Sequence, residues 1–106
     1  MLSSEQLKWL SADQLAWTLC LEIPFHNINR WIGIIRLARE SDSKKLDVAL
    51  GLISMDDCEE CVIWALNTSC LNRNFLWRVR EDGKTRKVRE LAERILFGER
   101  YPEFWI

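Results

Sequence analysis

Apolar residues recur every three or four positions along most of the chain, which is the spacing of one face of an α-helix. The clearest stripe consists of Ile28, Trp31, Ile32, Ile35 and Ala38. The segments 46–53 and 88–96 repeat the pattern, and charged residues fill most positions between the apolar ones. This spacing predicts an all-α fold, a compact bundle of about five to seven short helices that can pair as helical hairpins.

Polar residues with capping chemistry mark the expected helix starts. Two pairs have the three-residue spacing of a capping box, namely Ser3 with Gln6 and Ser11 with Gln14. Further helix starts are expected at Asn27 or Asn29, at Ser43 and at Ser54. Pro24 must follow the end of the second helix because it lacks a backbone N–H, and Gly98 is placed to end the last helix in a left-handed cap.

Residues 72–82 fit two patterns. Phe75, Trp77 and Val79 alternate as they would in a strand, and Asp82 with Gly83 would suit a hairpin turn. Phe75, Leu76 and Val79 also fit one face of a helix. A single hairpin is poorly supported in an otherwise helical chain, so we favour a short helix here.

Length and composition favour one domain over residues 1–106. The chain has 106 residues, of which 48% are hydrophobic, enough to build a core without metal ions or disulfides. No apolar run is long enough to span a bilayer, and residues 1–6 lack the basic and apolar regions of a signal peptide. We therefore expect a cytoplasmic protein with no membrane partner, in which the four cysteines are free thiols.

Cys58 and Cys61 form the one motif of chemical interest, because two thiols three residues apart on a helix can share a metal ion or form a disulfide. A zinc site would need a second pair, and only Cys20, His26 and Cys70 remain to supply it. Redox chemistry would need a stabilised thiolate, which the neighbouring carboxylates disfavour. The expected inner face of this helix contains Cys58, Cys61, Val62, Ala65, Leu66 and Ser69. We interpret both cysteines as small core residues and expect no metal and no cofactor.

No group of residues in the sequence is typical of catalysis. His26 is the single histidine, and its place after Pro24 in a linker favours a solvent-facing or capping ring. There is no nucleophile elbow, glycine-rich phosphate loop or zinc-protease motif. The carboxylates Asp56, Asp57, Glu59 and Glu60 lie at an expected helix start, where the helix dipole stabilises them. We predict that the protein is not an enzyme and has no catalytic residues.

Charge is unevenly distributed along the chain. Residues 40–71 contain seven carboxylates and two lysines, whereas residues 72–100 contain nine cations and five carboxylates. The basic segment 73–89 contains Arg73, Arg78, Arg80, Lys84, Arg86, Lys87 and Arg89. It resembles a phosphate-contacting surface in composition, which makes nucleic-acid binding the alternative function. We favour pairing of these cations with the acidic residues 56–60, within the fold or across a homodimer.

Six tryptophans are more than a core of this size can bury completely. Trp31 and Trp64 lie near the apolar faces of their helices, and the second helix carries Trp17 beside its leucines. Trp9 and Trp77 are the rings we expect to be partly exposed, either as partner contacts or as lids over the core. Exposed aromatics beside arginines are typical of protein interfaces.

The sequence therefore predicts a small protein–protein interaction module, such as an adaptor, an anti-activator or a toxin-neutralising immunity protein. Its expected partner-binding residues are Trp9, Trp77, the acidic residues Asp56, Asp57, Glu59 and Glu60, and the seven cations of segment 73–89. A homodimer is also expected, formed by acidic and basic segments or by the apolar tail 101–106, which should pack on its own chain or on a neighbour.

Overall fold

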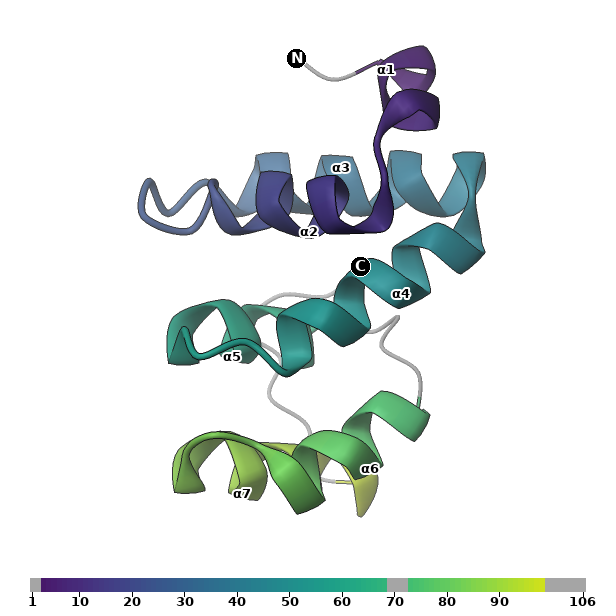
Figure 1. The fold of residues 1–106 in the computed structure, drawn as a ribbon. Helices are drawn as coiled ribbons and strands as arrows, with labels where there is room; N and C mark the ends of the chain where they lie inside the picture. The colour runs from purple at the N-terminus through teal and green to yellow at the C-terminus, as the bar shows by residue number, and fades with distance from the viewer. Residues whose placement is uncertain (1–2, 69–72, 99–106) are drawn as a thin grey trace. The chain divides into compact units, whose positions relative to one another are not determined.

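The structure, a computed structural model, describes residues 3–68 and 73–98 (Figure 1). Within these two ranges the chain forms seven α-helices and no β-strand, which confirms the predicted all-α fold. Contacts between Cα atoms divide the chain into two units, residues 1–52 and 53–106. The expectation of one domain over residues 1–106 stays a prediction, and the expected packing of the tail 101–106 lies outside the described residues.

The first unit contains three helices and most of a fourth. They are α1 (Ser4–Trp9), α2 (Ala12–Cys20), α3 (Ile28–Ser41) and α4 (Ser43–Ser54). α1 packs against α3. The Nζ of Lys45 in α4 donates a hydrogen bond to the carbonyl oxygen of Leu7 in α1 at 2.7 Å. This bond fixes the start of α4 to the short first helix.

Capping boxes begin α1 and α2, as the sequence predicts. The Oγ of Ser3 accepts from the backbone N–H of Gln6 at 3.3 Å, and the Oε1 of Gln6 accepts from the backbone N–H of Ser3 at 2.9 Å. Ser11 and Gln14 repeat both bonds at 3.2 and 2.8 Å. Asn27, one of the two expected caps of α3, accepts from the N–H of Arg30. These bonds satisfy backbone donors that a helix end leaves unpaired.

Two expected caps are wrong. Asp42, which ends α3 in an extended conformation, caps α4 by accepting from the N–H of Lys45 at 3.1 Å, so Ser43 is already helical. Ser54 does not begin the fifth helix, because the buried stripe of α4 continues through Ile53 and carries the helix to Ser54. Cys58 caps the next helix instead.

Trp31 is completely buried, as its position on the predicted stripe indicates. Ile35 and Ala38 of the same stripe are also buried, whereas Ile28 and Ile32 are only partly buried and Ile34 takes an inner position. The other buried apolar side chains of the first unit are Leu7, Leu15, Ala16, Leu19, Ile23, Leu46, Ala49 and Leu50. Each helix of this unit thus buries one apolar face.

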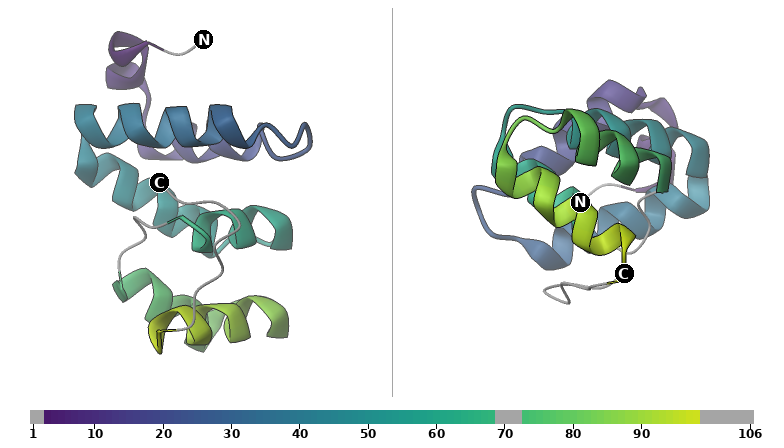
Figure 2. Two further views of the ribbon diagram at one scale, coloured as in Figure 1. Left: turned by 180° about the vertical axis from the view of Figure 1, so that it is seen from behind. Right: turned by 90° about the horizontal axis from the view of Figure 1, so that it is seen from below.

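The second unit contains α5 (Glu59–Leu66), α6 (Arg73–Asp82) and α7 (Arg86–Leu96). α6 and α7 lie side by side (Figure 2), and α5 also packs against α7. The helix expected over residues 72–82 is confirmed for residues 73–82, and the hairpin alternative is wrong there. Residue 72 lies outside the described residues. Val79 is buried while Trp77 is exposed, although a strand would place both on one face. Gly98 follows α7 with a φ of 92°, which is the predicted left-handed cap.

Gly83 is closely surrounded and Gly33 is not, and this difference predicts opposite effects of the same substitution. A Cβ on Gly83, between α6 and α7, would lie 2.5 Å from the carbonyl oxygen of Val79. A Cβ on Gly33, inside α3, would meet nothing within 4 Å. We expect Gly83→Ala to lower the free energy of unfolding by about 1–3 kcal/mol. Gly33→Ala should raise it by about 0.5–1 kcal/mol, because alanine loses less backbone entropy in a helix.

Urea unfolding followed by tryptophan fluorescence and far-ultraviolet circular dichroism measures both effects. Gly33→Ala is the matched control, since it adds the same methyl group in an open position. Equal stability of Gly83→Ala and the unaltered chain would contradict the close packing described between α6 and α7.

Candidate functional site

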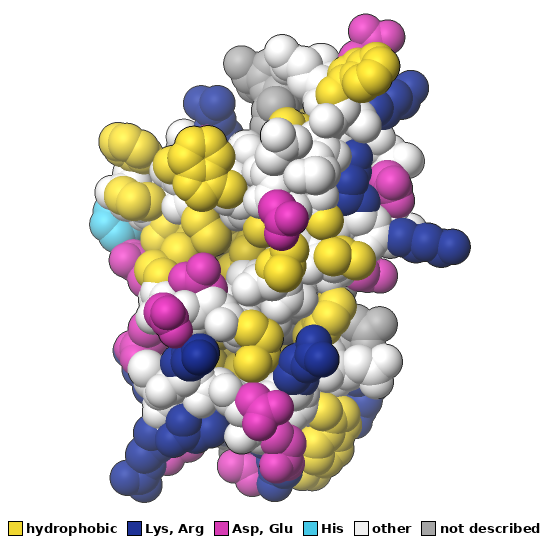
Figure 3. Space-filling model, viewed as in Figure 1, with side chains coloured by type: hydrophobic (Ala, Val, Ile, Leu, Met, Phe, Trp, Pro, Cys, Tyr) yellow, Lys and Arg dark blue, Asp and Glu magenta, His cyan; other side chains and the backbone are white. Residues whose placement is uncertain are grey.

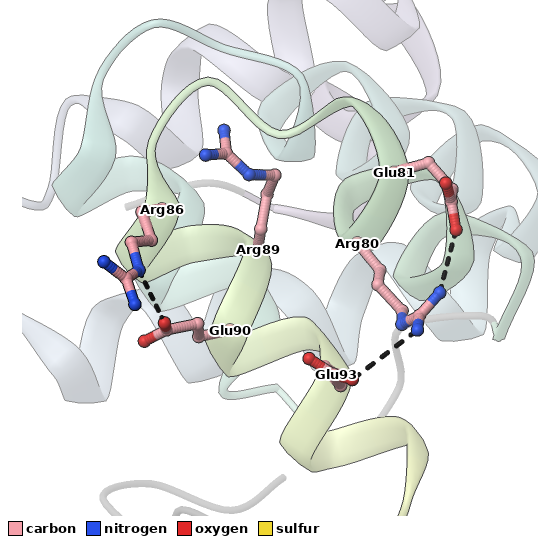
Figure 4. Close-up of a pocket in the computed structure, with 6 residues that line it drawn as sticks. All are labelled: Arg80, Glu81, Arg86, Arg89, Glu90 and Glu93. Carbon is pink, nitrogen blue, oxygen red and sulfur yellow. Dashed lines mark hydrogen bonds and ion pairs between the residues drawn. The ribbon is translucent and has the colours of Figure 1, made fainter.

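A pocket lined only by charged side chains lies between α6 and α7 (Figure 4). It has a volume of about 320 Å³, and its lining residues are Arg80, Glu81, Arg86, Arg89, Glu90 and Glu93. Sites for small organic ligands are mostly apolar with a few polar groups. A pocket with three cations and three carboxylates therefore does not fit that class of ligand.

Every arginine of this pocket has a partner within the chain. Arg80 pairs with Glu81 at 2.8 Å and with Glu93 at 3.5 Å. The Nε of Arg86 lies 2.9 Å from an oxygen of Glu90 on the same helix. Arg89 donates to the carbonyl oxygen of Gly83 at 2.7 Å, as the N–H of an arginine at a helix junction can do. We interpret the pocket as an ion-pair network that joins α6 to α7.

Arg80 also lies against two aromatic rings. Its guanidinium carbon is 5.2 Å from the centre of the Trp77 ring and 5.8 Å from that of Phe97. The two rings meet edge to face, with centres 6.1 Å apart. Trp77 is 40% exposed, which confirms its predicted partial exposure. Because its ring contacts both Arg80 and Phe97, it acts as a lid over the junction of α6 and α7.

The lysines at the start of α7 lie beside carboxylates at the start of α5. Lys84 Nζ is 3.7 Å from Asp57, and Lys87 Nζ is 4.0 Å from Glu59. These groups are largely exposed, so each pair contributes at most about 1 kcal/mol to stability. Lys84 and Lys87 thus pair with the acidic residues 56–60 within the chain, as the interpretation favoured from the sequence expects. Arg80 and Arg86 pair instead with carboxylates of α6 and α7. The homodimer stays a prediction.

The remaining charged residues predicted to bind a partner are not brought together. Asp56 accepts a hydrogen bond from the backbone N–H of Cys58 at 2.7 Å. Glu60, Arg73 and Arg78 are exposed and form no ion pair within residues 3–68 and 73–98. Most of the basic segment is thus engaged inside the second unit, and only Arg73 and Arg78 keep both exposure and unpaired charge.

Three aromatic rings of the first unit face solvent. Trp9 is 86% exposed, Phe25 79% and Trp17 67%. The exposure of Trp9 confirms a prediction, whereas Trp17 and Phe25 were not singled out from the sequence. A signal was present for Trp17: it is two residues from Leu15, which places it about 200° around the helix, on the opposite face.

Trp17, Leu21 and Phe25 make up what we call the α2 surface. Trp17 and Leu21 are four residues apart, and Phe25 lies four residues further in the turn that follows α2. All three are exposed. On α4, Val48 and Leu52 are also exposed and four residues apart. Figure 3 shows hydrophobic side chains gathered over α2 and the turn after it.

The cysteine motif differs from its predicted arrangement. Cys58 is exposed and has an extended backbone, and it caps α5. It therefore does not belong to the inner face of the helix. Cys61 is buried, as expected. Among the described residues no three His, Cys, Asp or Glu side chains could hold a metal ion, and Cys70 and Ser69 lie outside them. His26 is exposed in the turn before α3, with a φ of 51°, in agreement with its predicted solvent-facing position.

Comparisons with known proteins give no indication of the function. No protein-family model, no curated protein and no solved structure matches it. Within residues 3–68 and 73–98, none of the helices combines the length and the apolar character that a membrane span requires.

The contacts of Arg80 predict that it stabilises the second unit more than a neighbouring arginine does. We expect Arg80→Ala to lower the free energy of unfolding by about 1–2 kcal/mol, since it loses two ion pairs and two ring contacts. Arg78→Ala is the matched control on the same helix, because Arg78 is exposed and forms no ion pair within the described ranges. It should change stability by less than about 0.5 kcal/mol. Thermal and urea unfolding of both variants test this, and equal effects would contradict a stabilising role of Arg80.

Proposed function

We propose that this chain is a protein–protein interaction module that binds its partner through the α2 surface. The observation that carries the proposal is the exposure of Trp17 and Phe25, at 67% and 79%, on either side of exposed Leu21. Tryptophan and other large apolar side chains supply most of the binding energy where they insert into a partner. An adaptor, an anti-activator and an immunity protein would each use such a surface.

The exposed rings contribute little to the folding of this chain. Burying a large apolar side chain completely is worth about 1.5–3 kcal/mol, and rings that stay mostly in solvent gain only a small part of this. Burial against a partner would gain the remainder. Burial of the α2 surface would therefore contribute more free energy to binding than it now contributes to folding. The fully buried Trp31 already contributes its apolar area to folding.

The chemistry of α2 favours an apolar groove on a folded protein as the partner. The helix contains one charged residue, Asp13, and no lysine or arginine. Helices that lie on a membrane surface usually carry Lys and Arg on their polar face, which attract anionic lipids. α2 lacks this feature, so its apolar face fits a protein groove better than a lipid surface.

The state of the basic segment also supports a protein partner rather than a nucleic acid. Lys84, Lys87 and Arg80 have carboxylate partners within the chain, and each would have to exchange that partner for a phosphate. Binding through phosphates needs several available cations at once. Trp9, at the end of α1, remains a second exposed anchor that the same protein partner could contact.

Substitution of the exposed rings tests the proposal. The partner would be cross-linked through a photoreactive residue at position 13, one turn before Trp17 on α2, then identified, purified and titrated against the variants by calorimetry. We expect Trp17→Ala and Phe25→Ala each to weaken binding by about tenfold or more, as loss of an interface anchor does. Phe97→Ala, which removes an exposed ring of the second unit, is the matched control and should change the affinity less than about twofold.

Three other outcomes would overturn the proposal. Unchanged affinity of Trp17→Ala and Phe25→Ala would exclude the α2 surface. Binding to vesicles of phosphatidylcholine and phosphatidylserine that depends on Trp17 would assign the surface to membranes. A doubled mass in light scattering that returns to 12.6 kDa in Trp17→Ala would make a second copy of this chain the occupant.

A further inference from the structure

The turn between α2 and α3 ends on a residue with an unusual backbone conformation. His26 has a φ of 51°, in the left-handed region that residues with a Cβ rarely adopt. Its backbone N–H donates to the carbonyl oxygen of Ile23 at 2.9 Å, and the next N–H, from Asn27, donates to the carbonyl oxygen of Glu22 at 3.3 Å. This pair of hydrogen bonds is the pattern of a left-handed cap, in which glycine is the usual residue.

Elsewhere the same chain uses glycine for a left-handed residue after a helix. Gly98, which follows α7, has a φ of 92° and no side chain that this conformation could strain. Histidine tolerates the left-handed region better than most residues, but glycine adopts it without the steric cost of a Cβ. The imidazole of His26 is exposed, and within residues 3–68 and 73–98 it forms no hydrogen bond or ion pair. The side chain therefore adds a steric cost to the turn without a polar contact that offsets it.

We propose that His26 is a recognition residue of the α2 surface, and that its imidazole donates a hydrogen bond to a carboxylate on the rim of the partner's apolar groove. This inference rests on the proposed function and names the polar chemistry of the same site. His26 directly follows Phe25, the last ring of the α2 surface, and both residues are exposed. One turn thus carries an apolar anchor and a hydrogen-bond donor at adjacent positions.

The turn is held in place by contacts within the first unit. Ile23 is only 2% exposed and anchors the turn in the core. Glu22 Oε1 lies 3.0 Å from the Nε of Arg30, and the side chain of Asn27 caps α3. A segment that is already ordered loses less conformational entropy on binding than a flexible one does. The turn can therefore position the exposed ring of His26 for a partner without first having to fold.

The charged groups near His26 favour a carboxylate on the partner. Glu22, the acidic residue of the turn, is buried and its charge is paired with Arg30. Arg30 keeps half of its side chain exposed. A carboxylate accepts hydrogen bonds from both imidazole and guanidinium N–H groups, whereas a lysine or arginine of the partner would face the exposed guanidinium. The N-terminal end of α3 therefore presents donors beside the apolar α2 surface.

Substitutions of His26 test the proposal on the partner that cross-linking through position 13 identifies, with affinities measured by calorimetry. His26→Ala removes the imidazole and should weaken binding about fivefold, the effect of losing one hydrogen bond. His26→Gln keeps an N–H donor and should bind within about twofold of the unaltered chain. His26→Glu has no N–H donor in its ionised side chain and repels a carboxylate, so it should weaken binding about twentyfold or more.

His26→Gly adds a second readout of opposite sign. Because glycine adopts the left-handed conformation without strain, this variant should unfold at a higher urea concentration than the unaltered chain. It should nevertheless bind as weakly as His26→Ala. A gain in stability together with a loss of affinity is not expected of a residue that only closes the turn. A lower urea midpoint of His26→Gly would show that the histidine serves the fold, and would overturn the proposal.

Trp17→Ala and Phe25→Ala, titrated against the same partner, separate failure of this inference from failure of the proposed function. Full affinity of all His26 variants, with both ring variants weakened, would overturn the recognition role alone. Full affinity of the ring variants would overturn the proposed function and this inference with it. Equal losses in His26→Ala, His26→Gln and His26→Glu would exclude a carboxylate as the group contacted. Asn29→Ala, at an exposed position in the first turn of α3, is the matched control and should leave the affinity unchanged.

Discussion

Helix length is the constraint on which the rest of this structure depends. The seven helices have 6 to 14 residues, and isolated helices shorter than about 12–15 residues are only marginally stable in water. Each helix therefore depends on hydrogen bonds to the backbone groups at its ends and on burial of one apolar face. Side chains provide such hydrogen bonds at the N-termini of four helices, from Ser3, Ser11, Asn27 and Thr85. Stripes of aliphatic side chains provide the apolar faces.

Burial of one face leaves the other face of each helix to carry function. On α2 that outer face holds Trp17, which the buried Leu15 and Leu19 force outward by their spacing. On α6 the outer face holds Trp77, but Arg80 and Phe97 cover it in part. Trp77 and Trp17 thus differ: Trp77 contacts Arg80 and Phe97 of its own unit, whereas Trp17 is open to solvent.

Local signals in the sequence predicted the features that depend on near neighbours. The capping boxes involve residues three apart, and Gly98 acts through its own φ angle, so both could be recognised before any tertiary contact was known. The helix over residues 73–82 was predicted on a different ground, because the local pattern fitted both a strand and a helix and a single hairpin was poorly supported in an otherwise helical chain. The prediction of Ser54 as a cap is wrong, because only the packing of α4 shows that its helix continues that far.

Features of the candidate sites that depend on distant residues could not be predicted from the sequence alone. Charge complementarity indicated that the acidic and basic segments pair, but only the fold shows that Lys84 meets Asp57. The exposure of Cys58 depends on where α5 begins, which the pattern of apolar residues placed too early.

The central proposal is that the α2 surface binds a protein. Oxidative footprinting of tryptophan and phenylalanine, with and without the partner, tests it. The account predicts that Trp17 and Phe25 react readily in the free chain and are protected in the complex, while buried Trp31 stays unreactive in both. Protection confined to Trp77 and Phe97, with Trp17 still reactive, would contradict it.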